Sequence, residues 1–113
     1  MADSGILVGW DRVAPGEDVG AVELWGEITV YLARMHAEGL VDSHEPVLLG
    51  AHGGDLNGFI LIRGSQENLH RVRNSEEFLQ LVVKANKKLL GFRVLRAHFG
   101  SEVQKLMRIF ATL

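Results

Sequence analysis

Hydrophobic and polar positions along the chain follow two periods, and the order of these periods predicts the fold. Residues 6–13 form a β-rich run. Apolar residues then recur every three or four positions from Val22 to Met35, which is typical of an amphipathic helix, and Gly39 is expected to end that helix. The pattern therefore opens as a strand followed by a long helix.

The middle of the chain predicts two strands joined by a glycine-rich turn. Residues 41–49 form the second strand, and Pro46 within it predicts an edge strand, because proline has no N–H for the hydrogen-bond ladder. Residues 58–63 are apolar through their middle, as in a central strand that is covered on both faces. Helices on one side would cover only one of these faces, so we expect a second surface over the other.

The last part of the chain predicts helix, strand and helix. Ser65 is expected to begin a short helical turn, and Asn74 or Ser75 to begin the helix after it. Residues 91–99 alternate as a fourth strand, and the apolar residues of 101–113 recur at helical spacing.

This βαββαβ order has few compact solutions. We expect one α+β domain over residues 1–113, with a ferredoxin-like core at 6–99 and a short C-terminal helix at 101–113. The core should be a four-stranded antiparallel sheet with its helices on one face.

Composition narrows the classes of function. The chain is 47% hydrophobic and 23% charged, and its net charge of −2 gives no general attraction to nucleic acid or anionic lipid. It has no cysteine, which excludes disulfides, thiolate metal sites and cysteine nucleophiles. No apolar run reaches the roughly 18 residues of a membrane helix, and the first residues do not read as a signal peptide. We therefore predict a cytoplasmic protein with no nucleic-acid or membrane partner.

Four short motifs, taken in order, carry a family resemblance. They are Ala37-Glu38-Gly39 at the end of the long helix, Glu45-Pro46-Val47-Leu48, the Gly53-Gly54 turn that leads into Gly58-Phe59-Ile60-Leu61, and Ser75-Glu76-Glu77-Phe78. Together they resemble the dimeric α/β-barrel superfamily, whose ferredoxin-like subunits pair sheet to sheet. The nearest branches are the YCII-related proteins and the small proteins similar to antibiotic-biosynthesis monooxygenases. The resemblance implies a homodimer through the sheet faces.

The chain departs from the YCII-related pattern where that branch carries its chemistry. Ile28 stands where the branch has a histidine on the first helix, and Glu76 stands where it has an aspartate. The His–Asp pair that would move a proton is therefore missing, and the branch's activity does not carry over.

The five histidines do not have the spacing of a metal motif. No two of them form His-x-x-His or His-x-x-x-His, so we expect no metal site, and nothing in the sequence implies a cofactor. The turn at residues 50–58 has the glycines of a hairpin without the Gly-Lys-Ser/Thr ending of a phosphate loop. A likeness of residues 57–62 to an RNA-recognition motif lacks the second stacking aromatic.

Polar and aromatic residues on the predicted strands and turn form the candidate site. We expect His44 and His98 as catalytic groups, because a neutral imidazole can accept a proton near neutral pH. Substrate-binding residues would be Trp10, Arg63, His52 and Asp55. One hairpin register puts Glu45 opposite Arg63, and a slip of one residue puts His44 there instead.

The sequence leaves two functions open. The first is a cofactor-independent enzyme that acts on a small organic molecule in a pocket between sheet and helices. The second is a non-catalytic ligand-binding or assembly module whose strand polar residues serve the dimer interface. An enclosed pocket of at least about 300 Å³ that reaches Trp10 and a strand histidine would favour binding, and a solid interior would favour the assembly module.

Overall fold

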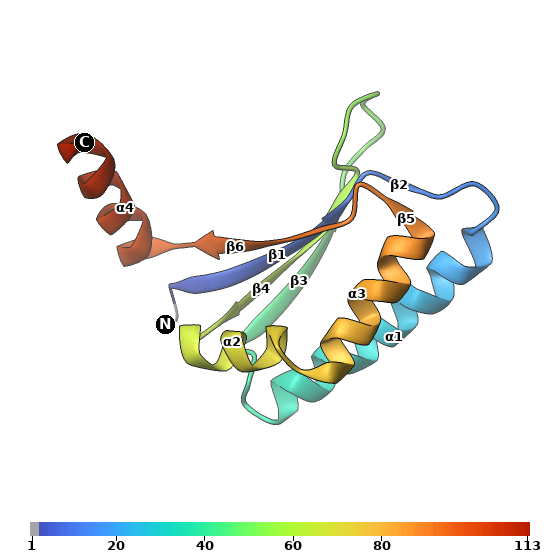
Figure 1. Cartoon of the computed structure of the whole chain (residues 1–113), viewed down its shortest axis with the longest axis horizontal. Coiled ribbons are helices and arrows are strands. Elements are labelled where there is room, and N and C mark those ends of the chain that lie inside the picture. The colour runs from blue at the N-terminus through green and yellow to red at the C-terminus, as the bar shows by residue number, and fades with distance from the viewer. Residues whose placement is uncertain (1–2) are drawn as a thin grey trace.

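The computed structural model describes residues 3–113, and its centre is a four-stranded antiparallel sheet (Figure 1). The strands lie in the order β3–β4–β1–β6. This order, with its helical connections, is ferredoxin-like and confirms the α+β fold that the sequence predicts. The strand bounds are Ser4–Trp10 for β1, Ser43–Leu48 for β3, Gly58–Gly64 for β4 and Arg93–His98 for β6.

The positions of β3 and β4 in the sheet agree with their sequences. β3, which contains Pro46, lies at an edge and pairs only with β4. β4, with its continuous apolar run, lies inside the sheet and pairs with both β3 and β1. Proline is tolerated in β3 because one side of an edge strand needs no backbone donor.

Three helices cover one face of the sheet (Figure 1). α1 spans Asp18–Ala37, and Gly39 follows with a φ of 78°, the left-handed conformation in which glycine commonly ends a helix. α2 spans Gln66–Arg73 and α3 spans Glu76–Lys88. The side chains of α1 and α3 meet along an exposed seam of ion pairs, such as Glu27–Lys84 at 2.9 Å.

A serine hydroxyl caps the start of α2 and of α3. Ser65 accepts a hydrogen bond from the backbone N–H of Asn68, and Ser75 accepts one from that of Phe78. Ser75 rather than Asn74 therefore starts α3. Asn74 instead follows the end of α2, where its side-chain amide donates to the carbonyl of His70.

The hydrophobic core lies between the sheet and these helices. Its most deeply buried side chains come from alternate positions of β1 and β4 and from one face of each helix. They are Ile6, Val8, Ile60 and Ile62 from the strands and Leu24, Tyr31, Leu32, Leu69, Val72 and Ala85 from the helices, together with Val41 just before β3. Because alternate strand residues point to opposite faces, this set fixes which residues face the helices and which face away.

The expected hairpin registers between β3 and β4 were wrong. Ser43 lies opposite Arg63, and His44 lies opposite Ile62, so neither Glu45 nor His44 pairs with Arg63. The ladder closes earlier than expected, with Leu48 opposite Gly58. A nine-residue loop over residues 49–57 therefore connects the two strands.

The middle of the sheet face away from the helices is apolar, and the charged residues Glu45, Arg63 and Arg93 lie around it. Strand alternation places Leu7, Phe59, Leu61 and Leu95 on it, with Leu61, Leu7 and Leu95 in one row across three strands. Leu95 is 51% exposed. We call these four residues, with Phe99, the open face; in Figure 1 α1, α2 and α3 all lie on the other side of the sheet.

Two elements extend the ferredoxin-like core. α4, at Gly100–Thr112, confirms the expected C-terminal helix and stands apart from the other three helices (Figure 1). The radius of gyration, 15.1 Å, exceeds the roughly 13 Å expected for a compact chain of this length. A small ladder between β2, Arg12–Val13, and β5, Leu89–Leu90, was not predicted.

No side chain of α4 is buried by the rest of residues 3–113, so its apolar residues lie outside the core. The large exposed ones are Val103, Leu106, Met107, Ile109 and Phe110. Across the same described range, no helix has the length and apolar character needed to cross a bilayer.

Candidate functional site

The two histidines expected to be catalytic lie at opposite edges of the sheet. His44 is on β3 and His98 is on β6, with β4 and β1 between them. Three strand spacings separate these edges by about 14 Å. Both side chains face the helix layer, but the strand order keeps them out of a common site.

His44 lies beside a second histidine. Its ring centroid is 6.3 Å from that of His36, in an edge-on arrangement, and the side chain is half-buried. The Nδ1 of His36 is 3.0 Å from the carbonyl oxygen of Val41, at the entry to β3. These contacts place His44 among groups that hold the edge strand to α1.

His98 belongs to the joint between β6 and α4. Its Nδ1 lies 2.7 Å from Oε1 of Glu102, and the hydroxyl of Ser4 donates to the other carboxylate oxygen of Glu102. The hydrogen bond from Ser4, and then that from His98, lower the pKa of Glu102 below its ordinary range. His98 therefore helps to fix the direction in which α4 leaves the sheet.

Arg63 lies on the open side of the sheet. Its guanidinium carbon is 3.7 Å from the centre of the Phe99 ring, which is a cation–π contact. The Phe99 ring in turn covers Gly5, where a Cβ would come within 2.4 Å of it. Arg63 is thus remote from Trp10, which faces the helices at the other end of β1.

The structure does bring Trp10 and His52 together. Both line a cavity of about 420 Å³ at the end of the sheet where β1 passes into β2. Trp10 packs edge-on against Trp25, with ring centroids 5.8 Å apart, and it also covers Gly58. We call this hollow the loop cavity; its lining residues are Trp10, Asp11, Arg12, Val13, Ala51, His52, Gly53, Gly54 and Asn57.

Asp11, which sequence reasoning did not single out, holds the loop in place. Its Oδ1 accepts a hydrogen bond of 2.7 Å from the backbone N–H of Leu56 and forms an ion pair with Arg93. Its backbone carbonyl accepts a hydrogen bond from the side chain of Asn57. At Gly91, where φ is 66°, a Cβ would lie 2.0 Å from the Asp11 carboxylate. The sequence could have pointed to Asp11 by two features: it is a carboxylate directly after the first strand, and a glycine-rich loop that needs an anchor follows much later in the chain.

The His52 side chain makes its hydrogen bonds within its own loop. The backbone N–H of Gly54 donates to Nδ1 at 3.2 Å, so this nitrogen carries the lone pair. The neutral ring then has its proton on Nε2, which lies 3.3 Å from the carbonyl oxygen of Leu56. Both ring nitrogens are used within the loop. Asp55 is exposed in the same loop and is not among the residues that line the cavity.

The space beneath the centre of the sheet is filled. The cavity there, between β1, β4 and the facing sides of α1 and α3, measures about 20 Å³ and is lined by apolar residues such as Val8, Leu32 and Phe78. A volume of this size holds at most one water molecule. No group of three or more metal-ligating side chains lies together within residues 3–113.

Comparison with known proteins bears on the fold. No family model matches the sequence, and a search of curated proteins gave no match. Several solved structures are similar. A protein from Methanosarcina mazei superimposes with a TM-score of 0.61 at 9% identity, over 88% of this chain and 95% of that one.

Two bacterial structures are also similar in fold at low sequence identity. A dimeric protein of unknown function and ferredoxin-like fold from Bacteroides fragilis has a TM-score of 0.58 at 8% identity, over 85% of this chain and 96% of that one. A Pseudomonas aeruginosa protein has a TM-score of 0.57 at 21% identity, over 87% of this chain and 95% of that one. These similarities define the class as ferredoxin-like α+β proteins.

Proposed function

We propose that the protein is a homodimeric assembly module that pairs through the open face of its sheet and does not use its strand histidines for catalysis. The observation that carries this proposal is the open face itself. Leu7, Phe59, Leu61 and Leu95 form a contiguous apolar patch on the side of the sheet away from the helices, and such patches commonly mark interaction sites. A second copy of the chain is the occupant that we propose.

The dimensions of the surface suit such a pair. Standard strand spacings make the sheet face about 19 by 24 Å, and α4 adds an apolar strip about 20 Å long. Together these surfaces are of the order of the ~800 Å² that each partner of a standard interface buries. The similar structure from Bacteroides fragilis is described as dimeric, which supports a dimer here.

The positions of the histidines support an assembly module over an enzyme. His98 is bonded to Glu102 and His52 to its own loop. His44 lies at the opposite edge of the sheet from His98. A general base needs a free lone pair within reach of its substrate. His52 uses both ring nitrogens within its loop, and the strand order keeps His44 and His98 from acting on one substrate together.

One observation favours the second candidate, a cofactor-independent enzyme acting at the loop cavity. Leu56 has a φ of 60°, the left-handed conformation that costs a non-glycine residue free energy and that recurs at active sites. The Asp11 carboxylate that holds its N–H also lines the cavity. This candidate predicts that a bound small molecule shifts the NMR signals of Gly53, Gly54 and Asn57.

Light scattering on matched variants tests the proposed dimer. Leu95 on the open face and Leu79 on α3 are each 51% exposed in the single chain, so Leu95→Lys and Leu79→Lys cost the subunit similar burial. We expect the wild type and Leu79→Lys to be dimers and Leu95→Lys to be a folded monomer, because a buried unpaired lysine opposes association. Equal masses for the two variants would overturn the sheet-face dimer.

A further inference from the structure

A large cavity lies away from the predicted site residues, where α2 faces β1 and the edge strand β6. Its volume is about 870 Å³, within the range of small-molecule sites. We call it the α2 cleft. It lies on the helix side of the sheet, so a dimer formed through the open face leaves it accessible. Its lining residues are Ser4, Gly5, Ile6, Gln66, Glu67, Leu69, His70, Arg71, Arg73, Asn74, Leu79 and Arg96.

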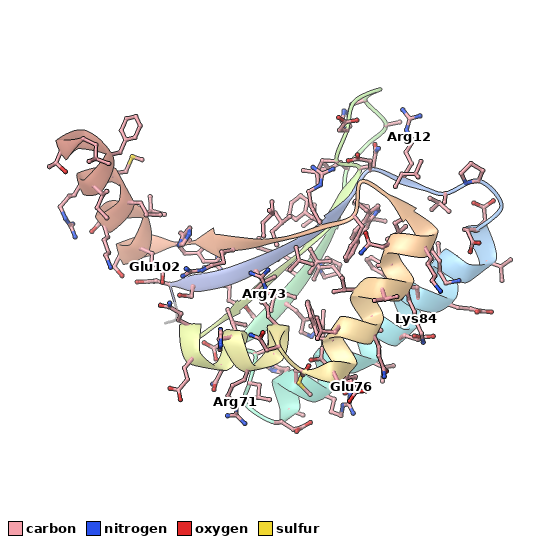
Figure 2. The ribbon with its side chains drawn as sticks, viewed as in Figure 1. Arg12, Arg71, Arg73, Glu76, Lys84 and Glu102 are labelled. Atoms are coloured by element: carbon pink, nitrogen blue, oxygen red, sulfur yellow. The ribbon has the colours of Figure 1, made fainter. Side chains whose placement is uncertain are left out.

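The sheet register and the helix period explain why arginines meet here. Arg96 pairs with Ile6, a core residue, so the Arg96 side chain points to the helix side of β6. Arg73 lies four residues after Leu69 on α2 and so shares its face of the helix. Figure 2 shows Arg73 between the end of α2 and the sheet.

The charge of the α2 cleft is unbalanced. Arg71, Arg73 and Arg96 line it with a single carboxylate, that of Glu67. Among residues 3–113, the ion pairs involve Arg34, Arg93, two lysines and His98, and none involves an arginine of this cleft. Guanidinium groups that face one cleft repel each other unless an anion lies between them, and their planar N–H groups match a carboxylate.

The cleft also has apolar walls. Ile6 and Leu69 form its base with exposed fractions of 1% and 4%, and Leu79 at its rim is 51% exposed. A purely ionic ligand would leave the exposed side chain of Leu79 in contact with water. An organic acid with an apolar body would satisfy both parts, its carboxylate on the arginines and its body on Leu69 and Leu79.

We propose that the α2 cleft binds a small organic carboxylate, with Arg73 and Arg96 as the carboxylate-binding residues. The proposal goes beyond the homodimer and does not depend on it. It says which class of ligand the cleft binds, and it includes no chemical reaction.

NMR titration of the ¹⁵N-labelled full chain with sodium phenylacetate tests this proposal. Phenylacetamide serves as the uncharged analogue, and inorganic phosphate serves as an anion without an apolar body. We expect saturable shifts of the amide signals of Leu69, Asn74 and Arg96 with phenylacetate. Binding of phenylacetamide and of phosphate should each be at least about tenfold weaker.

Arginine variants locate the site. Arg73→Gln and Arg96→Gln should each weaken phenylacetate binding about tenfold. Arg12→Gln should leave it unchanged, because Arg12 is an exposed arginine at the loop cavity, at the far end of the sheet (Figure 2). If Arg73→Gln fails to fold, Arg96→Gln decides the question, because Arg96 is exposed and outside the core.

Three results would overturn the proposal: the absence of saturable shifts, equal binding of phenylacetate and phenylacetamide, or a loss of binding in Arg12→Gln alone. If phosphate binds as tightly as phenylacetate, the proposed contact between the apolar body of the ligand and the cleft is refuted. The Leu95→Lys variant separates this proposal from the dimer. We expect a monomeric Leu95→Lys to bind phenylacetate as the wild type does, since Leu95 points to the other side of the sheet.

Discussion

The guanidinium of Arg63 lies over the ring of Phe99, with its central carbon 3.7 Å from the ring centre. The two residues come from β4 and from the end of β6, and the Phe99 ring covers the backbone of Gly5 on the strand between them. A charged residue on the sheet face away from the helices is thus held against an aromatic surface. This contact reduces the cost of burying Arg63 when a second sheet covers it.

Replacement of Phe99 should destabilise the sheet. Phe99→Ala removes the cation–π contact and exposes the Gly5 backbone, and we expect it to lower the free energy of unfolding by about 1–2 kcal/mol. Thermal or urea unfolding measures the change. Leu79→Ala, at an exposed helix position, is the control, and a Phe99→Ala effect no larger than the control would show that the contact is not stabilising.

The loop at residues 49–57 should depend on Asp11. Asp11→Ala leaves the N–H of Leu56 and the side chain of Arg93 without their acceptor, and we expect a loss of about 1–3 kcal/mol. Gly91→Ala should act in the same direction, because its Cβ would meet the same carboxylate. Hydrogen exchange at Leu56 should become faster in both variants. Unchanged protection there would show that Asp11 does not hold the loop.

The joint of α4 should weaken in acid. The pKa values of Asp3 and Glu102 both lie below their ordinary values of 3.8 and 4.5, because Ser101 donates to Asp3, while Ser4 and then His98 donate to Glu102. A carboxyl group whose pKa is lower in the folded state stabilises that state above its ordinary pKa. This stabilisation is lost as the pH falls through the lowered value.

Amide hydrogen exchange of residues 101–103 measures this loss. The measurement runs from about pH 6 to about pH 3, which brackets the ordinary pKa values of the two carboxyl groups. Exchange rates, corrected for the intrinsic effect of pH, should show falling protection at the acid end. Glu102→Gln should lower the protection at pH 6 and remove part of the pH dependence. The same pH profile in both proteins would contradict the role of Glu102.

His44→Ala distinguishes a structural histidine from a functional one. Since the His44 ring is half-buried beside that of His36 on an edge strand, we expect a lower melting temperature from a loss of about 0.5–1 kcal/mol. Phenylacetate binding at the α2 cleft should be unchanged. If His44→Ala has wild-type stability but altered ligand binding, His44 has a functional role and not a structural one.

Element types and strand positions could be predicted because each leaves a local signal. Pro46 marks an edge, the apolar run of β4 marks a central strand, and the serines at 65 and 75 mark helix starts. Such signals arise from backbone constraints within a few residues of the chain.

The candidate site could not be predicted in the same way, because it depends on contacts between distant segments. The β3–β4 register is set by a loop that Asp11 holds from 45 residues away. His44 and His98 share a sheet face by alternation, but the strand order, which local patterns do not specify, places them at opposite edges. The arginines of the α2 cleft meet for the same reason, from segments that are separate in the sequence.

The claim that the open faces of two sheets meet can be tested most directly by isotope-filtered NMR on a mixed sample of labelled and unlabelled chains. Only contacts between different chains give signals in this experiment. The proposed dimer predicts intermolecular NOEs from the methyl groups of Leu7, Leu61 and Leu95, which form one row on the open face. A sample without intermolecular NOEs, or with NOEs only from the outer side chains of α1 and α3, would contradict it.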